Sequence, residues 1–109
     1  MFVKIASEGA ISLLEKDDYK KLSVRVAVGT PLSSVDATLE AADAGKLLSQ
    51  PAGHAALSVK WLRALQDDEA GRQAFDAMVE HAAQKGWVIE GGSMLMAHLH
   101  RADDDATLS

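Results

Sequence analysis

Alternating apolar and polar residues near the N-terminus predict β-strands. Across residues 22–28 the positions on one side are leucine and valine, whereas Ser23 and Arg25 fall on the other side. A period of two with β-branched residues is typical of a strand that has one buried face. Residues 2–6 and 10–14 predict two shorter strands, and a helix beginning at residue 10 is the alternative for the second of them.

The middle of the chain changes to the period of amphipathic helices. A first helix is predicted to begin near Ser33, where Asp36 has capping-box spacing, and to end at Gly45. A second helix is predicted to follow Pro51, because proline is tolerated in a first turn. Its expected buried face consists of large apolar side chains, namely Leu57, Trp61, Leu62 and Leu65.

The third predicted helix and the strands that follow it have clear boundaries. Asp67 or Asp68 is expected to cap the helix, and Gly86 is expected to end it. Residues 87–90 and 94–100 then predict a hairpin around two consecutive glycines.

Strands at both ends of the chain, with helices between them, favour an α+β fold over alternating βαβ units. We predict one domain of residues 1–101, in which an antiparallel sheet of four to five strands packs on about three central helices. A total length of 109 residues suits a single domain. Residues 102–109 include three consecutive aspartates and predict a frayed acidic tail.

The predicted hairpin is apolar on both faces. If the two glycines form a two-residue turn, Ile89 pairs with Met94 and Val88 pairs with Leu95, whereas a turn one residue longer or shorter would change these pairs. One face then carries Val88, Leu95, Ala97 and Leu99, and the other carries Trp87, Ile89, Met94, Met96, His98 and His100. In a sheet with one solvent-exposed face, apolar and polar residues would alternate more clearly along each strand. We therefore expect either a second copy of the chain or a small-molecule pocket on the second face.

His98 and His100 are two residues apart on one strand, so both imidazoles project to the same side. Two such side chains can share a metal ion or act as an acid–base pair. A zinc site needs a third ligand, and no other histidine or acidic residue has a sequence spacing that is typical of a zinc-binding motif. We favour a polar rim at the strand end and predict no bound metal.

Three other side chains are candidates, each with an ordinary structural alternative. His54 is predicted in the first turn of the second helix, either as a neutral donor to a ligand or as a half-buried side chain bonded to backbone. Arg25 needs an anion if it is buried, from Glu90, a dimer mate or a ligand carboxylate, and otherwise extends along an exposed face. Trp87 fits a pocket or the core, whereas Trp61 is expected in the core.

Composition excludes several classes of partner. With 16 acidic and 11 basic residues the net charge is −5, and the basic clusters that bind nucleic acid are missing. No apolar run approaches the roughly 20 residues that span a bilayer. The chain has no cysteine, hence no disulfide or thiolate site, which fits the cytoplasm. We expect no cofactor, because no cofactor-binding motif is present.

These observations favour a small cytoplasmic binding or interaction module. Its ligand would be a small apolar or aromatic molecule beside the C-terminal hairpin. The candidate binding residues are Trp87, Met94, Met96, His98, His100, Arg25 and His54. The alternatives are a small enzyme that uses His98 and His100 in acid–base or metal-assisted chemistry, and a regulatory partner of another protein. A homodimer is predicted to use Met94, Met96 or Trp87 at its interface.

Overall fold

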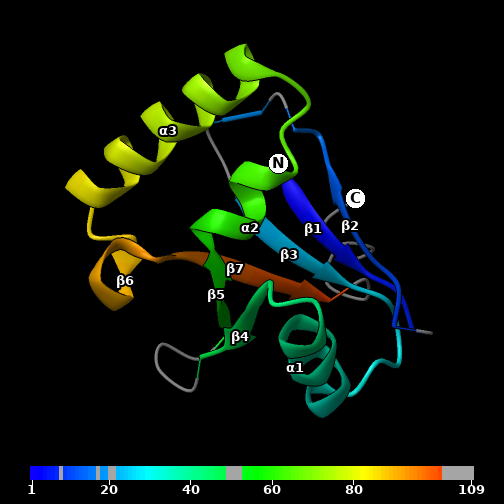
Figure 1. The fold of residues 1–109 in the computed structure, drawn as a ribbon. Helices are drawn as coiled ribbons and strands as arrows, with labels where there is room; N and C mark the ends of the chain where they lie inside the picture. Colours follow the sequence, from blue (N-terminus) through cyan, green and yellow to red (C-terminus); the bar gives the residue numbers. More distant parts are fainter. Residues whose placement is uncertain (8, 17, 20–21, 49–52, 102–109) are drawn as a thin grey trace.

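The computed structural model describes residues 1–7, 9–16, 18–19, 22–48 and 53–101. In this part of the chain, seven strands form one mixed sheet and three helices pack on it (Figure 1). The strands are β1 (Phe2–Ile5), β2 (Ile11–Leu14), β3 (Ser23–Val26), β4 (Gly45–Leu47), β5 (His54–Ser58), β6 (Val88–Ile89) and β7 (Met94–Arg101). The helices are α1 (Leu32–Ala41), α2 (Val59–Ala64) and α3 (Glu69–Gln84). The predicted tail lies outside the described residues.

The sheet has the strand order β2-β1-β3-β7-β5-β4, and β6 pairs with the first residues of β7. β3 runs parallel to both β1 and β7, whereas the other pairs are antiparallel. The predicted α+β class, single domain and three helices are confirmed, but the prediction of an antiparallel sheet of four to five strands is wrong. Parallel neighbours need a long return connection. Here the chain passes through all three helices between β3 and β7, which brings β7 back in the direction of β3.

Residues 54–58 form a strand where a helix was predicted. β5 lies between β7 and β4, and its three central residues are completely buried. A strand that is buried on both faces loses its alternation and reads as a continuous apolar run, so its period does not distinguish it from a helix. α2 begins only at Val59, where the Ser58 hydroxyl accepts a hydrogen bond from the Trp61 N–H at 3.1 Å. Pro51 lies outside the described residues.

The first predicted helix exists as α1, and its ends differ from the prediction. Val35 and Leu39 are buried, as their spacing indicates. The capping box does not form, because the Asp36 carboxylate instead accepts a hydrogen bond from the Leu47 N–H at 3.0 Å and ties α1 to β4. Gly45 is the first residue of β4 rather than the residue that ends the helix.

α3 has both of its predicted ends. The Asp68 carboxylate accepts a hydrogen bond from the Gly71 N–H at 2.7 Å. At the other end, the Trp87 N–H donates to the Ala82 carbonyl at 2.9 Å, and the Gly86 N–H donates to the Ala83 carbonyl in the last turn. These two bonds form the Schellman motif, which places Trp87 directly beside the end of the helix.

The register of the C-terminal hairpin, which the sequence leaves open, is the one that a two-residue turn gives. Val88 pairs with Leu95, and Ile89 pairs with Met94. The two turn glycines have φ angles of 67° and 94°, which the tight turns of hairpins require. The residues on the two faces of β7 therefore alternate as the sequence predicts.

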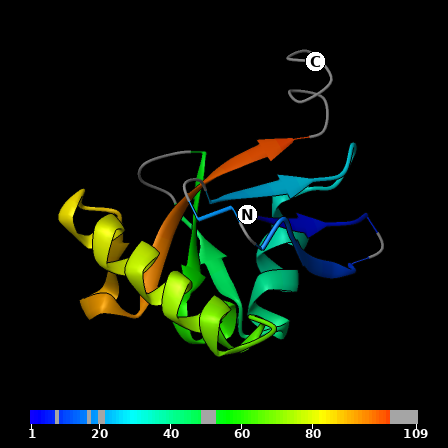
Figure 2. The ribbon, with the colours of Figure 1, turned by 90° about the horizontal axis from the view of Figure 1, so that it is seen from above.

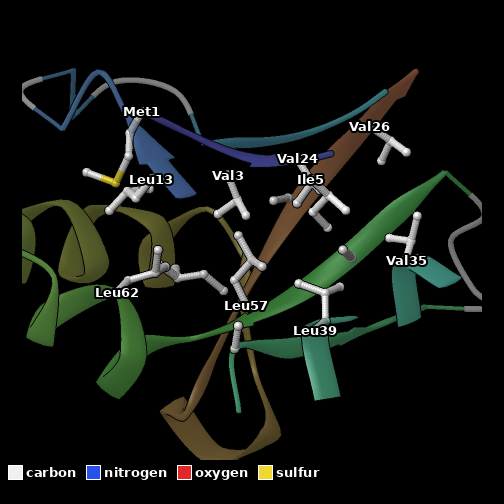
Figure 3. Packing of buried hydrophobic residues seen from close by; sticks show 14 of the residues in the cluster. Met1, Val3, Ile5, Leu13, Val24, Val26, Val35, Leu39, Leu57 and Leu62 are labelled. Atoms are coloured by element: carbon white, nitrogen blue, oxygen red, sulfur yellow. The ribbon is translucent and has the colours of Figure 1, made fainter. Parts of the chain in front are cut away.

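The core lies between one face of the sheet and the helices. Figure 3 shows Val3, Ile5, Val24 and Val26 from the sheet facing Val35, Leu39 and Leu62 from the helices. In Figure 2, α1 lies below β3, and α3 lies beside the first half of β7, while none of the described helices lies above β3 or the second half of β7. We call this second side the open face. It carries Phe2, Lys4, Ser23, Arg25, Met96, His98 and His100.

The longest described helix is α3, with 16 residues. Among the described helices, none has both the length and the apolar character that crossing a membrane requires.

Candidate functional site

A pocket of about 640 Å³ opens where β3 and β7 separate. β3 begins at Ser23, which lies opposite His98, whereas β7 continues back to Met94. On that side β6 pairs only with the first two residues of β7, so the edge of β7 between β6 and β3 is not covered by a strand. The C-terminal half of α3 and the start of β1 surround the opening, together with Glu15, Asp18, Tyr19 and Leu22.

The pocket combines an apolar wall with basic groups. Its apolar and aromatic side chains include Phe2, Tyr19, Leu22, Met78, Trp87 and Met96. Its basic side chains are Arg25, His81, Lys85, His98 and His100. Acidic groups, Glu15 and Asp18, line it from the segment that follows β2. Apolar walls with a few polar groups are the usual lining of small-molecule pockets.

Three imidazoles and one indole form a cluster centred on His98. His54 lies opposite His98 on the neighbouring strand, and their ring centroids are 4.4 Å apart. The His98 ring is 5.6 Å from that of Trp87 and 6.1 Å from that of His100. The predicted position of His54 in the first turn of a helix is therefore wrong, because β5 pairs with β7 and brings His54 to the site.

The pKa of the His98 imidazole lies below its ordinary value of 6.5. The largest cause is burial of part of the ring, which disfavours the charged form, and the neighbouring His54 and His100 lower the pKa further. A neutral imidazole has one N–H donor and one nitrogen acceptor. The lowered pKa favours this neutral form of His98, which can both donate and accept a hydrogen bond.

We expect an NMR titration of His98 to have its midpoint below 6.5, and the His54→Ala variant to shift that midpoint upward. His81→Ala is the control, since His81 does not contribute to the shift. Because the folded-state pKa is lowered, the unfolded chain binds this proton more tightly. The His98 contribution therefore makes the free energy of unfolding fall as pH drops from 6.5 to the folded-state pKa, and not further below it. A midpoint at or above 6.5 would contradict this prediction.

Arg25 is exposed, and its guanidinium carbon lies 4.0 Å from the centroid of the Phe2 ring. This cation–π contact holds the side chain along the open face. Glu90, one of three anions considered for a buried Arg25, instead accepts a hydrogen bond from the Lys46 ammonium at 3.1 Å. The exposed position of Arg25 agrees with the alternative, a side chain that extends along an exposed face. Arg25 forms no ion pair with any of the described residues.

The fold brings most of the sequence-predicted residues together. Trp87, Met96, His98, His100 and Arg25 all line the pocket, and His54 adjoins it through its ring contacts. Met94 does not line it, because this residue pairs with Ser58 and Ile89 at the far end of β7. Trp61 packs against the core, as predicted.

Sequence reasoning missed the contributions of β1 and α3. Phe2 alternates with the buried Val3, which places it on the open face once β1 is recognised as a strand. His81 and Lys85 are four residues apart, so they share one side of α3. That this side meets β7 is a consequence of tertiary packing and has no local signal.

Within the described residues, no three histidine, aspartate or glutamate side chains are arranged to hold a metal ion. Comparison of the chain with protein-family models, curated protein sequences and solved structures gave no match.

Proposed function

We propose that the protein binds a small molecule with an aromatic or apolar body in the pocket beside the C-terminal hairpin. The observation that carries this proposal is the pocket itself, whose volume of about 640 Å³ is within the range of small-molecule sites. Trp87 and Met96 give it a polarizable apolar wall, which suits an aromatic ring. His98 supplies a hydrogen-bond donor and an acceptor beside that wall.

The proposal can be tested by filling the pocket. His81 is exposed and lines the pocket, so His81→Trp is expected to occupy the cavity without disturbing the core. Ala83 is exposed and lies two residues later, on the opposite side of α3, since each helical residue turns by about 100°. Ala83→Trp is therefore a matched control on the same helix.

A panel of small neutral aromatic amides provides the probes, and saturation-transfer NMR measures binding. We expect at least one probe to bind the unmodified protein and the Ala83→Trp variant equally, and to bind His81→Trp at least about tenfold more weakly. Equal affinity for all three proteins would place the binding elsewhere. If none of the amides binds, and none of the corresponding aromatic carboxylates binds either, the proposal is wrong.

A second candidate is a small enzyme in which histidines perform acid–base chemistry. Its specific support is the 4.4 Å contact of His54 with His98, together with the lowered pKa of His98. His98→Gln distinguishes the two functions. An enzyme would lose turnover of a bound compound while retaining its binding, whereas a binding module would produce no turnover in either form.

Assembly and location stay predictions. The proposed homodimer interface includes Trp87, Met94 or Met96, all of which are half-buried in the single chain. We also propose the cytoplasm as the location, in keeping with a chain that has no cysteine.

A further inference from the structure

Three basic residues form a row across the open face. Lys4 on β1 is in register with Arg25 on β3, and Arg25 is in register with His100 on β7. In-register residues on parallel strands project to the same side, and the strands are about 4.8 Å apart. We call Lys4, Arg25 and His100 the basic row. Like charges in adjacent positions repel one another, so the pairing of Lys4 with Arg25 is unfavourable without an anion.

No member of the basic row forms an ion pair with any of the described residues. The next residue in register on the other side of Lys4 is the neutral Ser12. Glu15 follows Leu14, which pairs with Phe2, and so lies roughly 10 Å from the row along the strands. The chain has a net charge of −5, yet among the described residues that line the pocket the basic side chains outnumber the acidic ones.

The basic row is continuous with the pocket. Arg25 and His100 both line it, and Arg25 rests on the ring of Phe2, which lines it as well. His98, beside Trp87, is two residues from His100, a separation of roughly 6.6 Å along β7. A ring placed against Trp87 and His98 therefore has the basic row within reach of a short side chain.

We propose that the ligand is an aromatic carboxylate whose ring and carboxyl group are joined by one or two carbons. This inference rests on the proposed function and specifies the ligand of the same pocket. The ring packs against Trp87, and the carboxylate binds the basic row. Arg25 provides paired N–H donors that match a carboxylate, Lys4 adds a positive charge, and the His100 imidazole can donate an N–H.

The probes are 3-phenylpropionate and its neutral amide, which have nearly the same shape, and the affinities are measured by NMR titration at pH 7 in 0.05 M salt. We expect the carboxylate to bind about tenfold more tightly than the amide, because hydrogen bonds between charged groups are the stronger ones. Raising the salt concentration to 0.5 M is expected to lower the affinity for the carboxylate and to leave the affinity for the amide unchanged.

Two variants in the basic row, Arg25→Gln and Lys4→Gln, test the assignment of residues. Each variant is expected to bind the carboxylate at least about threefold more weakly than the unmodified protein does, and to bind the amide with unchanged affinity. Lys60→Gln is the control, because Lys60 is an exposed residue of α2 and the change removes the same charge from another part of the surface. The affinity of the Lys60→Gln variant for both probes should equal that of the unmodified protein.

The outcomes separate this inference from the proposed function. If the amide and the carboxylate bind equally, or if Lys60→Gln weakens the carboxylate as much as Lys4→Gln does, the basic row does not select the ligand, although the pocket still binds one. If neither probe nor any other aromatic compound binds, both proposals are wrong. The salt dependence and Lys4→Gln remain informative if Arg25→Gln does not fold.

Discussion

Replacing Gly45 with alanine is expected to lower the free energy of unfolding by at least about 3 kcal/mol, an effect reserved for severe mutations. Gly45 has a φ angle of 153°, and a Cβ atom added there would lie 1.9 Å from the Ala56 carbonyl oxygen. That oxygen belongs to the backbone of β5, so it cannot rotate away, and β4 would have to separate from β5. Chemical denaturation followed by circular dichroism measures the loss.

Gly29→Ala is the matched control for this change. Gly29 also has a positive φ angle, 80°, but no atom lies within 4 Å of the added Cβ. Only backbone strain of roughly 1–2 kcal/mol is expected there. If Gly45→Ala is no more destabilising than Gly29→Ala, the close approach of β4 to β5 is incorrect.

The second large effect is expected for Phe75→Ala. Phe75 is completely buried and is the buried residue through which α3 joins the core. Removing a buried phenyl ring costs about 3–5 kcal/mol, from lost transfer energy and from the cavity that remains. Urea denaturation measures this loss. Gln73→Ala, an exposed change on the same helix, should stay within about 0.5 kcal/mol of the unmodified protein.

Phe75→Ala also has a functional consequence, because α3 supplies one wall of the pocket through Met78 and Ala82. Under conditions where the variant is still folded, a loosened α3 should weaken binding of an aromatic ligand, whereas Gln73→Ala should not. A loss of stability below about 1 kcal/mol would show that α3 does not depend on Phe75.

Local sequence signals are sufficient to predict several elements of this fold. Asp68 and Gly86 mark the ends of α3, since capping bonds and the Schellman motif form within one turn of the helix. The two hairpin glycines indicate a turn between two strands, although the register of those strands is known only from the structure. The alternation of side chains along a strand then assigns Met96, His98 and His100 to one face of β7.

The site was predictable only in part. Its C-terminal half, Trp87 with Met96 and the two histidines, follows from the hairpin. Arg25 follows from the alternation of β3, but its position beside His100 does not, because the parallel pairing of β3 with β7 joins segments more than 70 residues apart in the sequence. Such a pairing depends on how the three helices return the chain, and no local pattern encodes it.

Only the tertiary structure decided that residues 54–58 are a strand. Alanine and leucine favour a helix, yet pairing on both sides with β4 and β7 outweighs that preference once the segment is fully buried. Because these residues form a strand and not the predicted helix, the ring of His54 lies against the ring of His98. The basic row has the same origin, since each of its residues lies on a different strand, and only the packing of the strands brings their charges together.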